Sequence, residues 1–302
     1  MRKRLMAAAA IAPLMLGYHA AHAQSLTISS DTSTPVATAT AVSGAPGDIT
    51  LNTGVTFTIK DTTPAITLNS ANNLALSGTI TSNNIDNATG VLISGGAGIV
   101  NNGGTISLSE SYTPSDSANS DGITEAPYAQ GTGRIAIHMT GPLSGSIINT
   151  GGIVIQGNNS IGISIDGALS PVADPTTGVT SAALVGGGTI TVVGNNSFGI
   201  RTTGEIVGSA SIGGGIAIKG QNSVGIQTNA PIDGALYFSG TISTTGYAVT
   251  ESAKPIQRST RPQPTETGTA QATLRLGLRR HEDVHPESRV RSRRGCVTLL
   301  RG

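Results

Sequence analysis

A seven-residue phrase occurs three times in the chain, and its spacing constrains the fold more than any other feature. It reads GNNSIGI at 157–163, GNNSFGI at 194–200 and GQNSVGI at 220–226. The opening glycines lie 37 and 26 residues apart, and the longer interval holds a Pro/Thr-rich piece around 171–177. A unit of about 26 residues with one insertion lies in the range of solenoid proteins. Such a unit cannot bury its own apolar face, so it must stack on its neighbours.

The residues around the motif predict short β-strands. From Ser25 to about Val249, apolar residues alternate with Thr and Ser and are broken by Gly and Asn. Examples are 55–59 and 189–192, and no segment shows a sustained helical period. The chain has 41 glycines, 3% aromatic residues and no Trp. A core built from Ile, Val, Leu and Ala suits thin repeated layers better than one compact globule.

Three short strands per unit predict an all-β chain folded as a right-handed parallel β-helix. Like positions of successive coils should then stack, which predicts two interior ladders: Ile161, Phe198 and Val224 in one, and Ile163, Ile200 and Ile226 in the other. An antiparallel β-sandwich is the alternative for short strands. It does not explain why Gly-x-Asn-Ser recurs at like positions, so we favour the solenoid.

The motif itself is interpreted as a corner of the coil. Gly and Asn tolerate left-handed backbone conformations, and Ser and Asn side chains can satisfy exposed backbone groups. The first two copies also match the Asn-x-Ser glycosylation pattern, which the third copy lacks. We therefore expect structural turn roles for six residues: Gly157, Asn159, Gly194, Asn196, Gly220 and Asn222.

The first 23 residues have the layout of a secretory signal peptide. A basic start at 2–4 precedes an apolar stretch at 5–17, and Ala21-His22-Ala23 supplies the small residues of a cleavage site. Cleavage after Ala23 would leave Gln24 as the mature start, with the export machinery as a partner. No later segment reaches about 18 apolar residues, so no membrane span is expected in the mature chain. The single cysteine, Cys296, excludes an internal disulfide.

Several phrases of the body resemble a known family. IINTGG at 147–152, VNNGGTI at 100–106, the repeated motif and the signal peptide are similar to the passenger regions of bacterial autotransporters. The resemblance covers about residues 1–250 and includes no catalytic motif. It implies export through the inner membrane and delivery of a β-helical passenger to the cell surface by a C-terminal β-barrel.

The last 52 residues depart from that pattern. We divide the chain into the signal peptide 1–23, the repeat region 24–250 and an irregular basic tail 251–302, which holds 11 of the 18 Lys and Arg residues. The tail cannot supply barrel strands. We interpret the junction as a frameshifted or prematurely ended reading frame, and a native basic tail is the rival reading. An intact parent would be at the cell surface or extracellular; without a barrel, the chain would stay periplasmic.

Candidate chemistry is sparse. His281, Glu282 and His285 match the His-Glu-x-x-His zinc pattern, but Pro286 follows at once and only 17 residues remain. We interpret the match as chance and predict no metal, cofactor or catalytic site. Outside the signal peptide and tail, His138 is the only histidine. A surface or rung role is favoured over a catalytic base.

Three acids, Asp166, Glu205 and Asp233, follow successive motifs and are expected to cap turns or accept backbone N–H bonds. A net charge of +1 argues against a nucleic-acid partner. The sequence thus predicts a non-catalytic exported solenoid with a structural or adhesive role toward host or bacterial surface ligands. The alternative is a secreted carbohydrate-active enzyme on the same fold.

Overall fold

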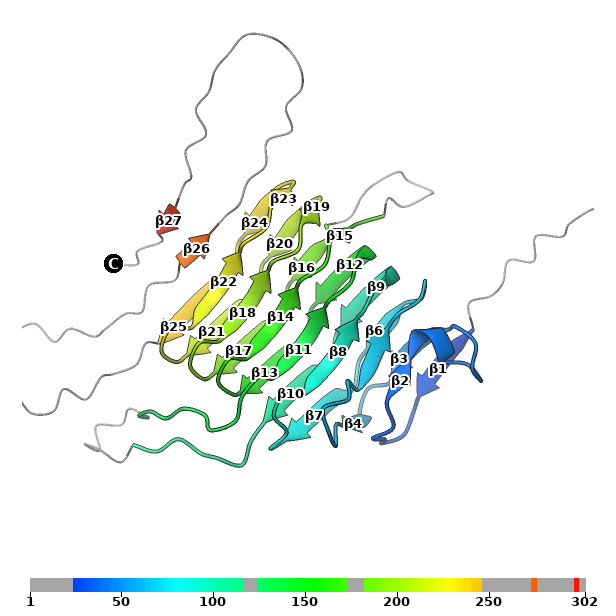
Figure 1. The fold of residues 1–302 in the computed structure, drawn as a ribbon, viewed down its shortest axis with the longest axis horizontal. Coiled ribbons are helices and arrows are strands. Elements are labelled where there is room, and N and C mark those ends of the chain that lie inside the picture. The colour runs from blue at the N-terminus through cyan, green and yellow to red at the C-terminus, as the bar shows by residue number, and fades with distance from the viewer. Residues whose placement is uncertain (1–23, 117–123, 173–181, 246–272, 276–295, 299–302) are drawn as a thin grey trace, which may run out of the picture.

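The computed structural model describes residues 24–116, 124–172, 182–245, 273–275 and 296–298. The predicted signal peptide with Ala23, and the His281, Glu282 and His285 match, lie outside these described residues. From Gln24 to Thr245 the chain winds as a parallel β-helix with three stacked sheets (Figure 1). The predicted all-β solenoid is confirmed. In the described part of the chain, no helix is long and apolar enough to span a membrane.

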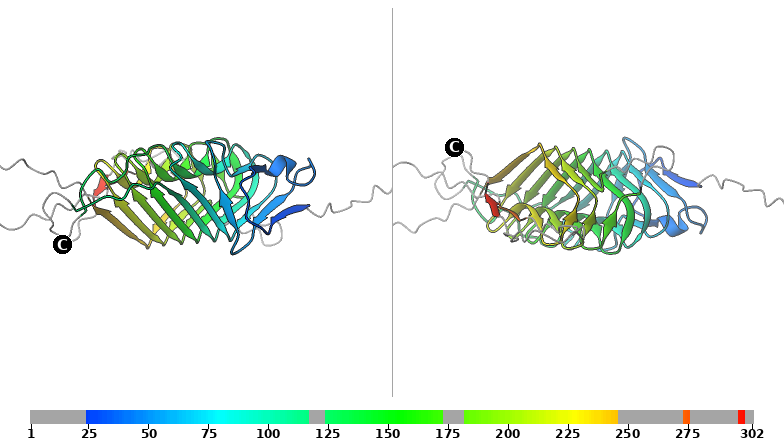
Figure 2. Two further views of the ribbon diagram at one scale, coloured as in Figure 1. Left: turned by 90° about the horizontal axis from the view of Figure 1, so that it is seen from below. Right: turned by 90° about the horizontal axis from the view of Figure 1, so that it is seen from above.

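Each coil contributes to three parallel sheets, named A, B and C here (Figure 2). Sheet A contains β1 (Ser25–Ile28), β3 (Asp48–Leu51), β6 (Leu74–Leu76), β9 (Gly96–Asn102), β12 (Leu143–Asn149), β15 (Leu169–Ser170), β19 (Ile206–Val207) and β23 (Ile232–Asp233), with β16 (Leu184–Gly186), β20 (Ala210–Ile212) and β24 (Leu236–Phe238) alongside. Sheet B contains β4 (Thr56–Thr58), β7 (Thr79–Asn83), β10 (Thr105–Ser109), β13 (Gly152–Gln156), β17 (Thr189–Val193), β21 (Gly215–Lys219) and β25 (Thr241–Thr245). Sheet C contains β2 (Val36–Ala37), β5 (Ile66–Leu68), β8 (Thr89–Ile93), β11 (Ile135–Met139), β14 (Ile161–Ile165), β18 (Phe198–Thr202) and β22 (Val224–Thr228).

Two features lie outside these sheets. A short 3₁₀ helix, η1 (Thr38–Thr40), precedes β3 near the N-terminal end of the coil. Within the predicted basic tail, the structure describes β26 (Thr273–Arg275) and β27 (Cys296–Thr298), which pair antiparallel. The rest of 251–302 lies outside the described residues.

The core is a column of aliphatic side chains. Alternation along each strand sends every second residue inward, so β4, β7 and β10 bury their second residues, Phe57, Ile80 and Ile106. Phe57 is the one fully buried phenylalanine among the described residues, and Ile, Leu and Val fill most other core positions. Complete burial of each contributes about 1.5–3 kcal/mol. The low aromatic content therefore matches a coil whose cross-section is only a few side chains wide.

One predicted ladder is buried throughout, and the other is buried only at Ile161. Ile163, Ile200 and Ile226 stack in register and are buried. Ile161, Phe198 and Val224 also stack in register, but Phe198 and Val224 are only half-buried, so their assignment to the interior was wrong. The reason is the glycine that follows each of them. A Cβ at Gly199, which follows Phe198, would lie 2.6 Å from the core atom Ile216 Cγ2, so the glycine position faces inward and Phe198 faces outward.

A column of glycines forms the corner between sheets A and B. A Cβ at Gly104, Gly151, Gly188, Gly214 or Gly240 would lie 1.8–2.0 Å from the carbonyl oxygen of the glycine one coil earlier. Real Cβ atoms do not approach backbone this closely. The glycine directly before β10, β13, β17, β21 and β25 therefore reflects direct packing of one coil's backbone on the next.

Alanine substitutions at this corner should distinguish a steric clash between coils from the general effect of replacing a glycine. Gly188→Ala should lower the free energy of unfolding by about 3 kcal/mol, because its Cβ would meet Gly151 O at 1.9 Å. Gly187→Ala is the matched control, since the nearest atom to its Cβ would be Thr150 Cγ2 at 3.8 Å. Urea unfolding midpoints measure both. Equal midpoints for the two variants would contradict close coil packing at this corner.

Candidate functional site

The repeated motif forms the corner between sheets B and C. Its middle asparagines, Asn159, Asn196 and Asn222, have φ angles of 50°, 54° and 57°. Gly194 and Gly220 have φ angles of 153° and 151° and pack on the glycine carbonyl one coil earlier. A Cβ at Gly157 would instead lie 2.6 Å from Ser160 Oγ. These positions thus occupy the tight backbone turns of successive coils.

The motif's polar side chains join those turns along the coil axis. Ser160 N–H donates to Ser197 Oγ at 3.1 Å, and Ser197 N–H donates to Ser223 Oγ at 3.0 Å. The side chain of the first asparagine in the motif also links neighbouring coils: Asn158 Oδ1 accepts the N–H of Asn195 at 2.8 Å. Gln221 N–H in turn donates to Asn195 Oδ1 at 2.9 Å. Each copy therefore satisfies backbone groups of an adjacent copy, which accounts for its repetition.

A long insertion between β10 and β11 is fastened to the first copy of the motif. Arg134 N–H donates to Ser160 Oγ at 3.0 Å, and Asn158 Nδ2 donates to Ala129 O at 3.0 Å. The Arg134 side chain is 1% exposed and forms ion pairs with Glu110 at 3.2 Å and Asp86 at 3.3 Å. Its guanidinium also donates to the carbonyl oxygens of Ile85 and Gln156.

Glu110 closes the other end of this insertion. Its carboxylate accepts the backbone N–H groups of Gln130 and Gly131, each at 2.6 Å, in addition to the Arg134 ion pair. The Glu110 side chain is 4% exposed. Arg134 and Glu110 thus hold together the two ends of an insertion that spans residues 110–134.

Loss of the arginine should release the insertion. Arg134→Met should cost about 3–5 kcal/mol, because Glu110 would stay buried without its partner. Unfolding midpoints and limited proteolysis within the insertion measure the effect. Glu110→Gln in the same chain should recover part of the loss by removing the unpaired charge.

Arg201→Met is the control, because its ion pair with Asp166 is partly exposed and should be worth about 1 kcal/mol or less. If Arg134→Met were no more damaging than this control, the anchoring role would be wrong.

A second polar cluster lies on the outer face of sheet C. His138 on β11, Ser164 on β14 and Arg201 on β18 occupy one row of stacked positions. Asp166 follows β14 and lies beside this row. His138 Nε2 donates to Asp166 Oδ2 at 2.9 Å, and Ser164 Oγ donates to the same oxygen at 3.1 Å. Parallel stacking thus gathers residues from three coils around one carboxylate.

The other Asp166 oxygen is also engaged. Thr203 Oγ1 donates to Oδ1 at 2.7 Å, and Arg201 Nη2 lies 3.6 Å from it. Partial burial tends to raise the pKa of Asp166, but the hydrogen bonds from Thr203, His138 and Ser164 and the positive charge of Arg201 outweigh burial. The pKa of Asp166 therefore lies below its usual value of 3.8. The expected turn cap was wrong here, because side chains of neighbouring coils occupy this carboxylate.

The cluster resembles a catalytic triad in composition but not in geometry. A nucleophilic serine needs its hydroxyl on the imidazole, with the acid on the far ring nitrogen. Here Ser164 and His138 both donate to the same oxygen of Asp166. The carboxylate therefore holds two neighbouring strands together, in the arrangement expected of a surface link between coils.

The acidity of Asp166 gives a pH test of that link. With a folded pKa below the unfolded one, the carboxylate stabilises the fold above about pH 4, and this contribution is lost as pH falls through the folded pKa. Asp166→Asn should lower the unfolding midpoint at pH 7, and its difference from wild type should shrink below about pH 4. Asp233→Asn, at an exposed position on β23, is the control. A difference that stayed constant down to pH 2 would contradict this assignment.

The other candidate residues do not join the cluster. Asp166 lies beside Thr203 of the next coil. Glu205 lies beside the start of β15, where its carbonyl oxygen accepts the N–H of Leu169, and Asp233 pairs with Val207 on β19. The three acids thus occupy different positions along the coil and form no ladder of carboxylates. Among the described residues, no group of three His, Cys, Asp or Glu side chains could hold a metal ion.

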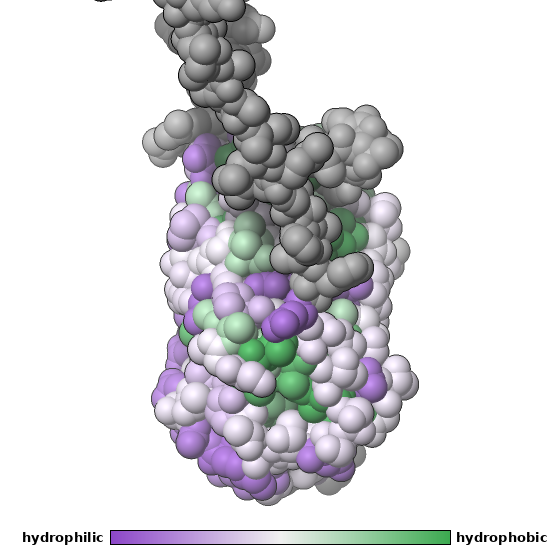
Figure 3. Space-filling model, turned by 90° about the vertical axis from the view of Figure 1, so that its right-hand side faces the viewer, coloured by the Kyte–Doolittle hydropathy of each residue, from purple (hydrophilic) through white to green (hydrophobic). Residues whose placement is uncertain are grey.

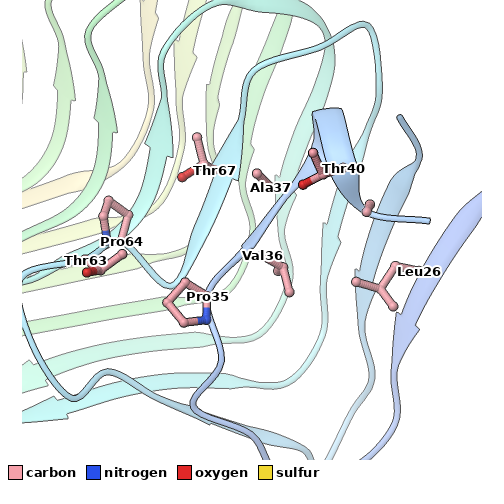
Figure 4. A pocket seen from close by; sticks show the side chains of 9 residues that line it. Leu26, Pro35, Val36, Ala37, Thr40, Thr63, Pro64 and Thr67 are labelled. Atoms are coloured by element: carbon pink, nitrogen blue, oxygen red, sulfur yellow. The ribbon is translucent and has the colours of Figure 1, made fainter. Parts of the chain in front are cut away.

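A hollow of about 350 Å³ opens at the N-terminal end of the coil (Figure 4). Apolar residues gather at the centre of this end (Figure 3), and Leu26, Val36 and Ala41 line the hollow with prolines and threonines. Its lining includes no titratable side chain. It is the uncovered end of the aliphatic column and offers no acid–base chemistry.

Comparison with known proteins gave no match to a family model, to a curated protein or to a solved structure.

Proposed function

We propose that the chain is a non-catalytic, exported β-solenoid of the autotransporter-passenger type, with a structural or adhesive role at a surface. The support comes from the site geometry and from the passenger-like phrases of the sequence. The observation that carries the proposal is the insertion at 110–134, which a buried arginine fastens to a stiff stack of coils. A loop fixed on a rigid scaffold is a common basis for recognition.

The arrangement of acids on the flank also supports a binding role over a catalytic one. Glycoside hydrolysis uses two carboxyl groups about 5–9.5 Å apart across the scissile bond. Asp166 is surrounded by donors from three coils, and the other two acids of the motif region lie at different coil positions. A carboxylate held by four side chains serves better as a structural link than as a free base.

Binding and catalysis can be tested on the same protein. The full chain, labelled with a fluorophore, would be incubated with bacterial cells, epithelial cells and immobilised matrix proteins, and separately with a panel of soluble polysaccharides. We expect retention on at least one surface and no new reducing ends. Arg134→Met should reduce retention, whereas Arg201→Met should not. Polysaccharide cleavage that is lost in Asp166→Asn would overturn the proposal and support the enzyme alternative.

A further inference from the structure

The outer face of sheet B carries two straight rows of small side chains. They are the outward positions on either side of the first inward-facing residue of each strand, which is Phe57 in β4 and Ile80 in β7. The first row contains Thr56, Thr79, Thr105, Gly152, Thr189, Gly215 and Thr241. The second row contains Thr58, Thr81, Ser107, Val154, Thr191, Ala217 and Ser243. Five of the seven positions in each row bear a hydroxyl group.

These hydroxyls are available to a ligand. All fourteen positions are half-buried or exposed. Within the described part of the chain, no protein hydrogen bond engages the hydroxyls of Thr79, Thr105 or Thr189 in the first row, or of Thr81 or Thr191 in the second. The face is also uncharged. The charged groups nearest the rows lie at their edges: Asp31 accepts the N–H of Thr56 at 2.7 Å at the N-terminal end of the first row, and Lys219 lies beyond the second row with its ammonium 4.6 Å from the Tyr128 ring.

The other faces differ. The outward row on sheet C includes His138 and Arg201, which the Asp166 cluster engages. On sheet A, the outward positions of β3 and β9 include Asp48, Asn101 and Ile99, with no repeated hydroxyl pattern. Sheet B is thus the one described face on which a neutral hydroxyl pattern continues over seven coils.

The geometry of the face is that of a lattice. Neighbouring strands are about 4.8 Å apart, and the two rows are separated by two residues, or about 6.6 Å. Threonine is β-branched and has few χ1 states, so each hydroxyl and methyl is held in place by its own backbone. A face of this kind presents hydrogen-bonding groups at fixed, repeated intervals with small apolar groups between them.

We propose that this face binds ice. A ligand that matches it must be uncharged, must offer donors and acceptors, and must repeat in two directions. Globular protein surfaces do not repeat at this interval, and a second copy of this solenoid is the protein partner that would. Sugar chains are commonly gripped by aromatic side chains, and the face has none. Water held between the threonine rows would be ordered at the spacing of the strands and could continue into a crystal. This inference rests on the proposed binding role of the solenoid and names a ligand for one flank.

The interruptions of the rows provide a gain-of-function test. A Cβ at Gly152 would lie 3.7 Å from the hydroxyls of both Thr105 and Thr189, which is ordinary contact. At Gly215 the closest atom would be Thr241 Oγ1 at 3.6 Å. Neither glycine has a positive φ angle. Threonine therefore fits at both positions, and Gly152→Thr with Gly215→Thr would complete the first row.

The experiment uses the full fluorescent chain and its variants in slowly frozen solution. The measurements are the fraction of protein taken into a growing ice hemisphere and the inhibition of ice recrystallisation. We expect the wild type to enter the ice fraction and the Gly152→Thr, Gly215→Thr chain to enter more strongly. Thr105→Tyr, which places a bulky ring in the middle of the first row, should fall to the level of an unrelated protein. Thr50→Tyr, at an outward position on sheet A, should behave as wild type.

Three results would overturn the proposal. The first is exclusion of the wild-type chain from ice while it is folded by circular dichroism. The second is retention on cellulose or chitin powder that Thr105→Tyr abolishes, with no uptake into ice, which would assign the face to a polysaccharide. The third is a dimer in gel filtration that Thr105→Tyr dissociates, which would assign it to a second copy. Surface adhesion sensitive to Arg134→Met tests the proposed function separately, so either proposal can fail alone.

Discussion

The direct contact of one coil's backbone with the next determines the rest of this structure. At the glycine column between sheets A and B, a carbonyl oxygen occupies the space that a Cβ would need. This approach keeps successive coils at hydrogen-bonding distance and in register from Gly104 to Gly240. The stacking of side chains in the described coils, whether in the core, at the corners or on the flanks, follows from that register.

Because the coils are in register, alternating residues of each sheet B strand fall into two environments, the core and the outer face. In sheet B the second residue of each of these strands enters the aliphatic column, and its two neighbours enter the outward rows. Isoleucine and threonine are both β-branched, so each suits a strand while differing in polarity. Repetition of Thr-Ile-Thr or Thr-Ile-Ser therefore builds a dry core and a hydroxylated face at the same time. The same stacking on sheet C gathers a histidine, a serine and an arginine around Asp166.

The coil and its corners were predictable from the sequence, because a repeated motif reports a repeated environment. The ladder of Ile163, Ile200 and Ile226 followed from alignment of the three copies. The outward orientation of Phe198 could not be predicted in this way. At the neighbouring glycine the strand departs from regular in–out alternation, and the sequence pattern does not show where this happens. The Asp166 cluster was missed because its members come from three coils and share no sequence spacing. Arg134 was missed because nothing near it in sequence shows that it is buried; its partners lie 24 and 48 residues away.

The anchoring of the insertion by Arg134 and Glu110 has a consequence for how this chain can change over time. The insertion is joined to the scaffold mainly at one corner, through two side chains and the first copy of the motif. Among the described residues between Ser111 and Ala129, none belongs to the aliphatic column, so this segment can vary in sequence and length without disturbing coil register. The solenoid can thus keep its fold while the loop that it carries is replaced, which makes the insertion between Glu110 and Gln130 a natural position for grafting a foreign segment.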